Sequence, residues 1–133
     1  MEYFFTNGIA VQEQVFNDLL IEIKKTSFGR DFKLKEVHSI DEFRNSVPLF
    51  SYDDIKPYID RVMHGEQKVL WPGEINWFAK SSGTTSDRSK FIPVSYEALE
   101  ECQFRGSRDL LTWYYYHNPE AKVFQGKGLI IGG

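Results

Sequence analysis

Cysteine is nearly absent from this chain. Among its 133 residues only Cys102 carries a thiol, which excludes an intramolecular disulfide and any zinc module built from several cysteines. The three histidines, His38, His64 and His117, lie far apart, and no pair has the spacing of metal ligands on a helix or a hairpin. We therefore expect no metal site built from these residues.

An excess of positive charge and a long apolar run are also missing. The chain has 16 Lys and Arg against 19 Asp and Glu, a net charge of −3, whereas broad nucleic-acid binding depends on a basic surface. No run approaches the roughly 18 apolar residues that cross a bilayer, and the start, Met1-Glu2-Tyr3, lacks the basic residues of a secretory signal. We expect a cytoplasmic protein with neither nucleic acid nor membrane as a partner.

Apolar residues make up 41% of the chain and aromatic residues 16%, a globular composition of single-domain length. Apolar side chains recur at helical spacing, which predicts a helix from about Ala10 to Lys25 whose apolar face carries Val11, Val15, Leu19 and Ile23, with Phe16 and Leu20 beside them. Gly29 follows this helix, where it is predicted to form a turn.

Two capping patterns predict further helices. Ser39 reads as the N-cap of a short helix that ends at Val47-Pro48. Ser51 and Asp54 have the spacing of a second cap, which explains Asp53-Asp54 better than a magnesium site does. Pro57 is expected to open a separate helix that reaches His64, with Gly65 as its stop.

The second half of the chain predicts strands around a polar loop. We expect strands at 74–80, 90–94 and 128–132, and a long helix from the cap Ser95 to His117 with an apolar stripe at Leu99, Cys102, Leu110, Trp113 and Tyr114. Cys102 is then a small core residue. The predicted fold is α/β: a helical lead-in over 1–66, then part of a mixed β-sheet with flanking helices over 67–133. Three or four strands are few for so many aromatics, so we expect the front of one larger domain.

The most informative segment is the loop that runs from Lys80 to Lys90. Five hydroxyl side chains lie around Gly83 between Ser81 and Ser86, and three cations against Asp87 give the segment a local net charge of +2. Backbone N–H groups and hydroxyls around a glycine can converge on one anion such as a phosphate. The loop lacks the G-x-x-x-x-G-K-[ST] pattern of the Walker loop. On composition alone, a plain polar hairpin connection is the commoner explanation.

The order of the residues favours the phosphate interpretation. A strand, Ser81-Ser-Gly-Thr-Thr85, four residues, Lys90 and then Phe91-Ile-Pro-Val94 resemble the first core motif of the adenylate-forming superfamily. Within it, the chain resembles the auxin-responsive-promoter family of acyl-acid amido synthetases, including its bacterial members. Four further segments resemble the family's helical lead-in: Thr26–Arg30, Glu42–Arg44 with Val47-Pro48, Tyr52–Ile59 and His64–Glu66.

The resemblance implies a ligase that works in two steps. A small carboxylic acid reacts with ATP in the presence of Mg²⁺ to give an acyl-adenylate and pyrophosphate, and an amino acid amine then takes the acyl group and releases AMP. It implies that the β- and γ-phosphates are held by Ser81, Ser82, Gly83, Thr84, Thr85 and Lys90. It names no general base in this segment. The family usually has glycine where this chain has Asp87, whose charge is expected to weaken phosphate binding.

The resemblance covers only the beginning of such an enzyme. The segments that would place magnesium and the adenine ring come later in the family, so we expect these 133 residues alone to be inactive and to self-associate through exposed apolar surface. The alternative from another class is a truncated, non-catalytic phosphate-binding or protein-interaction module.

Overall fold

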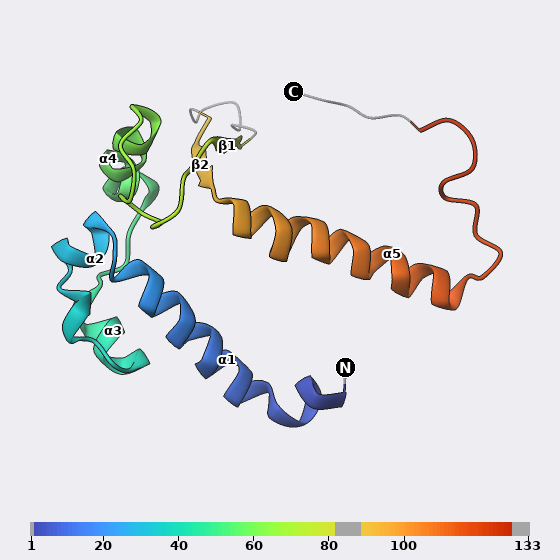
Figure 1. The fold of residues 1–133 in the computed structure, drawn as a ribbon, viewed down its shortest axis with the longest axis horizontal. Coiled ribbons are helices and arrows are strands. Elements are labelled where there is room, and N and C mark those ends of the chain that lie inside the picture. Colours follow the sequence, from blue (N-terminus) through green and yellow to red (C-terminus); the bar gives the residue numbers. More distant parts are fainter. Residues whose placement is uncertain (1, 82–88, 129–133) are drawn as a thin grey trace. The chain divides into compact units, whose positions relative to one another are not determined.

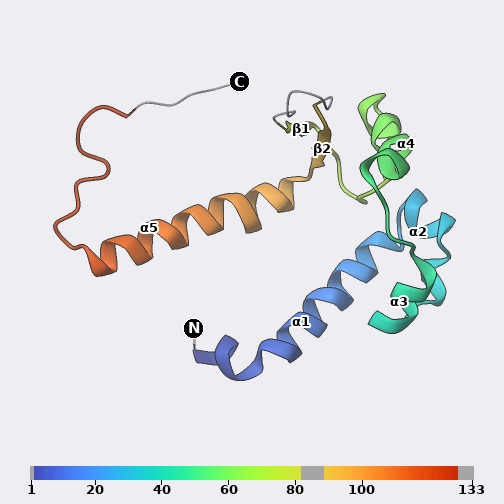
Figure 2. The ribbon, with the colours of Figure 1, turned by 180° about the vertical axis from the view of Figure 1, so that it is seen from behind.

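The computed structural model describes residues 2–81 and 89–128. Their elements, in chain order, are α1 (Glu2–Ile23), α2 (Ser27–Asp31), the 3₁₀ helix η1 (Leu34–Glu36), α3 (Ile40–Ser46), α4 (Tyr52–Met63), β1 (Trp77–Lys80), β2 (Phe91–Val94), the π-helical η2 (Ala98–Phe104) and α5 (Arg105–His117) (Figure 1). Figure 2 shows the same elements from behind. The chain divides into two compact units, residues 1–96 and 97–133. The predicted α/β class with a helical lead-in is confirmed, and the sheet within the described residues is one antiparallel pair.

Helix α1 is longer than the sequence predicted, and only part of its predicted apolar face is buried. It begins at Glu2 and passes through a non-helical Asn7. Val15 and Leu19, expected inside, are about half exposed, whereas Leu20 is buried and Phe16 and Ile23 pack against the same core. Positions 16, 20 and 23 also keep helical spacing. Aromatic residues of α2 and α3 determine which side of the predicted face is buried, and the periodicity of α1 alone does not reveal this.

Gly29 does not form the predicted turn but lies buried inside α2. A Cβ at this position would lie 2.1 Å from the carbonyl oxygen of Ile23, so glycine is needed for close approach of the two helices. Thr26, which is fully buried, caps α2: its Oγ1 accepts a hydrogen bond from the Gly29 N–H at 3.0 Å and donates one to the Ile23 carbonyl at 2.6 Å. The end of α1 and the start of α2 thus form one tight corner.

The core of the first unit consists of two apolar clusters. The larger one centres on Leu20, Phe28, Leu34 and Val37, and the ring of Phe28 lies within 4.7–5.9 Å of the rings of Phe32, Phe50 and Tyr58. The smaller one joins Val62 of α4 to Val69 and Ile75, which lie ahead of β1. Backbone N–H groups of Ser27 and Phe28 bond the carbonyls of Lys68 and Val69 at 2.8 and 3.0 Å. These bonds tie α2 to the segment that leads into the hairpin.

The predicted caps are confirmed, and the predicted break at Pro57 is wrong. Ser39 and Ser51 cap α3 and α4, and α4 ends in a Schellman turn at Gly65, whose φ is +90°. Pro57 lies inside α4, which is one continuous helix. Proline removes the hydrogen bond to the carbonyl of Asp53, an exposed residue whose carbonyl water can serve. Both halves of α4 pack on the core, through Ile55 and Val62, and this keeps the helix whole.

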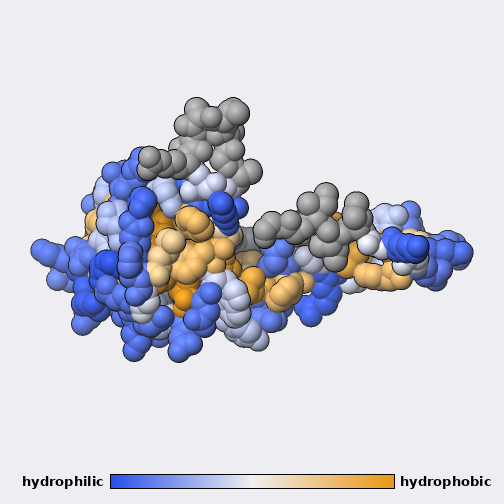
Figure 3. All heavy atoms as spheres, turned by 90° about the horizontal axis from the view of Figure 1, so that it is seen from above, coloured by the Kyte–Doolittle hydropathy of each residue, from blue (hydrophilic) through white to orange (hydrophobic). Residues whose placement is uncertain are grey.

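The second half of the chain follows the prediction in outline. The predicted strands 74–80 and 90–94 are observed in part, as β1 over 77–80 and β2 over 91–94, and helical residues run from 96 to 117 after Ser95. Neither η2 nor α5 has a buried residue on any face, so the expected apolar stripe is not buried: Cys102 is exposed, contrary to its predicted place in a core, as are Leu110, Trp113 and Tyr114. Figure 3 shows apolar side chains at the surface of the molecule.

The predicted strand at 128–132 falls, apart from Gly128, outside the described residues, and Gly128 is not in a strand. Over the part of the chain that the structure describes, no helix combines the length and the apolar character needed to span a membrane.

Candidate phosphate-binding hairpin

Two of the six predicted site residues, Ser81 and Lys90, are described, and the structure brings them together. The Ser81 N–H donates to the Lys90 carbonyl at 2.9 Å, and the Lys90 N–H donates to Ser81 Oγ at 3.0 Å. This pair extends the β1–β2 ladder, in which Lys80 lies opposite Phe91. The other four predicted residues, 82–85, lie outside the described residues, as does Asp87. Ser81 and Lys90, at the two ends of the polar loop, are therefore hydrogen-bonded neighbours.

Ser81 has a structural task that the sequence did not indicate. Its hydroxyl oxygen accepts the Lys90 N–H and so closes the hairpin through its side chain as well as its backbone. A hydroxyl carries one donor hydrogen and two acceptor lone pairs, so this contact leaves the donor hydrogen to be directed toward an anion. Ser81 can both close the loop and donate to a phosphate.

Tyr52, the first residue of α4, holds the other edge of β2. Its phenolic oxygen accepts the Phe91 N–H at 2.9 Å and donates to the Phe91 carbonyl at 3.2 Å, although the two residues are 39 positions apart. Its ring also lies under the ammonium of Lys90, with 5.5 Å between Nζ and the ring centroid, which is within the range of a cation–π contact. Tyr52 was assigned by sequence only to the lead-in, and no local pattern marks this contact.

A capping box holds the N-terminus of α4 and so fixes the backbone position of Tyr52. Ser51 and Asp54 form a reciprocal capping box, in which the Ser51 N–H donates to Asp54 Oδ2 at 2.8 Å. The hydrogen bonds from the Ser51 hydroxyl and N–H hold the pKa of Asp54 below its usual value. Further along α4, Ile59 and Val62 are buried, so the helix that carries Tyr52 is anchored in the core.

A second polar cluster joins three of the lead-in segments. Arg61 Nε donates to Glu66 Oε2 at 2.8 Å, its Nη2 donates to Ser27 Oγ at 3.1 Å, and its guanidinium lies 5.7 Å from the ring centroid of Tyr58. The Tyr58 hydroxyl donates to Asp31 Oδ2 at 2.9 Å. The hydrogen bond from Arg61 lowers the pKa of Glu66, whereas desolvation, followed by the bond to Asp31, raises the pKa of Tyr58. The cluster links α2 to α4 and is a structural feature.

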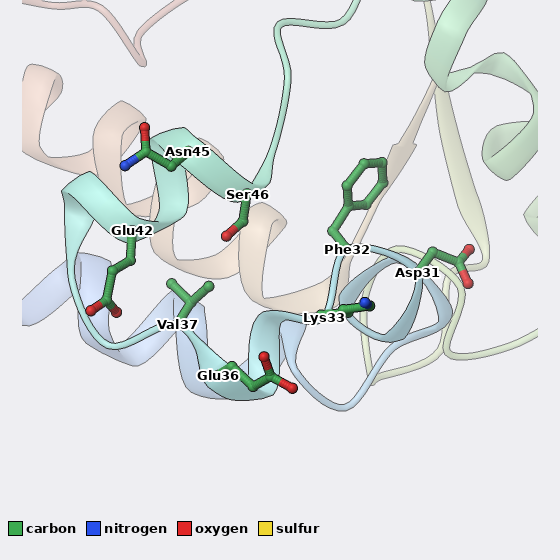
Figure 4. Close-up of a pocket in the computed structure, with 8 residues that line it drawn as sticks. All are labelled: Asp31, Phe32, Lys33, Glu36, Val37, Glu42, Asn45 and Ser46. Carbon is green, nitrogen blue, oxygen red and sulfur yellow. The ribbon is translucent and has the colours of Figure 1, made fainter.

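A surface depression of about 470 Å³ lies between α2, η1 and α3 (Figure 4), apart from the hairpin. Its lining comprises Asp31, Phe32, Lys33, Glu36, Val37, Glu42, Asn45 and Ser46. Three carboxylates against one ammonium repel a phosphate, so this depression is not a candidate for ATP. Among the described residues, no group of three or more His, Cys, Asp or Glu side chains is arranged to hold a metal ion.

Comparison with known proteins decides the family. The model of the GH3 family N-terminal domain matches residues 1–132. The chain belongs to the GH3 family. The resemblance to the acyl-acid amido synthetases that the Ser81–Lys90 motif carried is thereby confirmed.

Three curated relatives illustrate the family. The indole-3-acetic acid-amido synthetase GH3.17 of Arabidopsis thaliana is 34% identical over 106 residues, 78% of this chain and 17% of that protein. The jasmonoyl-L-amino acid synthetase GH3.5 of Oryza sativa subsp. japonica is 31% identical over 129 residues, 96% of this chain and 22% of that protein. The 4-substituted benzoates-glutamate ligase GH3.12 of Arabidopsis thaliana is 31% identical over 100 residues, 74% of this chain and 17% of that protein. The chain thus spans about a fifth of the length of these relatives.

Proposed function

We propose that this chain forms the N-terminal part of an ATP-dependent acyl-acid amido synthetase, and that its loop from Ser81 to Lys90 binds the phosphates of ATP. Membership of the GH3 family supports the reaction class, since the names of its relatives describe enzymes that join an acid to an amino acid. Because the chain spans about a fifth of these relatives, the activity belongs to the complete protein.

The observation that carries the proposal is the closure of the hairpin. Ser81 and Lys90 meet at its base through two hydrogen bonds, so a segment made of hydroxyl side chains, a glycine and cations begins and ends at one place. Lys90 brings a full positive charge to this point. Such an arrangement suits the β- and γ-phosphates, which Ser81, Ser82, Gly83, Thr84, Thr85 and Lys90 would hold.

The chemistry of adenylation explains what the loop does. The carboxylate of the acid attacks the α-phosphorus of ATP, the bond from that phosphorus to the bridging oxygen breaks, and pyrophosphate leaves with the negative charge. Lys90 and the loop donors stabilise that charge and orient the triphosphate, and they need not accept a proton. The amine of an amino acid then attacks the acyl carbon and displaces AMP.

The proposed substrates are a small carboxylic acid and an amino acid. Magnesium is proposed to accompany the triphosphate, because the resemblance to the adenylate-forming superfamily implies it. We propose that the protein acts in the cytoplasm, where ATP is available.

The test is pyrophosphate exchange into ATP by the complete protein. Lys90→Ala removes one charge-assisted contact worth about 1.5–3 kcal/mol, so exchange should fall about tenfold or more. Lys35→Ala, which removes an exposed lysine from η1, is the matched control and should leave exchange unchanged. Equal rates for the two variants would remove Lys90 from the site.

A further inference from the structure

Tyr52 contacts Lys90 and Phe91, the two residues at which the polar loop returns to the sheet. Its hydroxyl satisfies the N–H and the carbonyl of Phe91, and the face of its ring lies 5.5 Å from Lys90 Nζ. We propose that Tyr52 is a positioning residue for ATP binding, which aims the Lys90 ammonium at the phosphates. This inference rests on the proposed function of the loop.

The ring suits this task better than a carboxylate would. Lysine has a long flexible side chain with many rotamers, and a group that holds its ammonium in advance reduces the freedom lost when a phosphate binds. A carboxylate partner would hold it too, but would also neutralise its charge and compete with the phosphate. An aromatic face attracts the cation without cancelling its charge, so the contact with Tyr52 does not compete with a phosphate.

The hydroxyl contributes in a second way, through the backbone. In an antiparallel pair, alternate residues of a strand direct their N–H and C=O groups away from the partner strand. At Phe91 both groups are bound by Tyr52, while Lys90 bonds Ser81. Tyr52 therefore fixes the position of β2 immediately after the loop, on the base provided by the capped end of α4.

The experiment is a double-mutant cycle in the complete protein, read as the KM for ATP in pyrophosphate exchange. Tyr52→Leu removes the ring and the hydroxyl, and Lys90→Met removes the charge at similar length. Tyr52→Leu should raise the KM about two- to fivefold, the value of an exposed cation–π contact. In the Lys90→Met background the same change should have less than about half that effect, because coupled residues are not additive.

Two further variants make the test specific. Tyr52→Phe keeps the ring and loses the hydroxyl, so Lys90→Met should raise the KM in this background by more than in the Tyr52→Leu background and by no more than in the unchanged protein. Tyr58→Phe is the matched control: it removes a hydroxyl from the same helix that bonds Asp31 instead of the hairpin, and it should leave the KM for ATP unchanged.

Each outcome decides the matter. Equal effects of Tyr52→Leu with and without Lys90 would show a general structural role and overturn the inference, with the phosphate-binding loop untouched. If Tyr52→Leu does not fold, a larger effect of Lys90→Met in the Tyr52→Phe protein than in the unchanged protein would overturn it. An unchanged KM in Lys90→Met alone would overturn both the inference and the proposed function.

Discussion

Replacing Gly29 by alanine should strongly destabilise the first unit. The added Cβ would lie 2.1 Å from the Ile23 carbonyl oxygen and 2.9 Å from its carbon, both backbone atoms that cannot rotate away. Contact distances between carbon and oxygen are about 3.3 Å or more, so α1 and α2 must separate by about 1 Å.

The cost follows from what this separation disturbs. Overpacking in a buried site costs about 1–3 kcal/mol, and each hydrogen bond lost at the corner, from Thr26 to Ile23 or from Gly29 to Thr26, costs about 1 kcal/mol more. Alanine gains about 0.5–1 kcal/mol over glycine as a helix former. We expect the free energy of unfolding to fall by about 2–4 kcal/mol.

Urea unfolding followed by tryptophan fluorescence measures this loss. A Trp113→Phe background restricts the signal to Trp71 and Trp77, since the chain has three tryptophans and the other two lie in the first unit. Gly8→Ala is the matched control, because a Cβ there would meet nothing within 4 Å. It should be neutral or slightly stabilising. A Gly29→Ala midpoint equal to that of Gly8→Ala would refute the close approach of α1 and α2.

Two other predictions concern α4. Pro57→Ala should raise the free energy of unfolding by about 1 kcal/mol, because it restores an N–H for the Asp53 carbonyl in a continuous helix; a lower urea midpoint would show that the proline ring is needed for the helix direction. Asp54 has a pKa below its unfolded value of about 3.9, so the capping box stabilises the fold above that pH and loses its effect as the pH falls through the folded pKa. In Asp54→Asn, the free energy of unfolding should fall less steeply below pH 4 than in the unchanged protein. Asp53→Asn removes a neighbouring carboxylate outside the box and should not have this effect. Identical acid-unfolding curves for the two variants would contradict the capping role.

Local signals predicted the caps and turns of the fold. Ser39, Ser51 with Asp54, and Gly65 each act within a few residues of their partners, and each lies where the sequence indicated. Features that depend on distant partners were missed. Gly29 is fixed by the end of a preceding helix, and aromatic side chains from later helices determine which side of the predicted face of α1 is buried. Pro57 was misjudged because burial of both halves of α4 outweighs one missing hydrogen bond.

The residues of the site also divide into those that a local motif indicated and those that depend on the packing of distant elements. The motif itself marked Ser81 and Lys90, whose hydrogen bonds span a single loop. The contact of Tyr52 with Phe91 joins residues 39 positions apart, and neither its helix nor its cap indicates it. Similarly, Arg61, Glu66 and Ser27 meet only because α4 packs against α2. Such partners follow from the packing of elements and not from any one segment.

A crystal structure of the complete protein with ATP or a non-hydrolysable analogue tests the central claim most directly. The account predicts that oxygens of the β- or γ-phosphate lie within about 3.2 Å of the loop donors and of Lys90 Nζ, with the ring of Tyr52 still under the ammonium. A triphosphate bound elsewhere, with Lys90 and Ser81 out of its reach, would contradict the account.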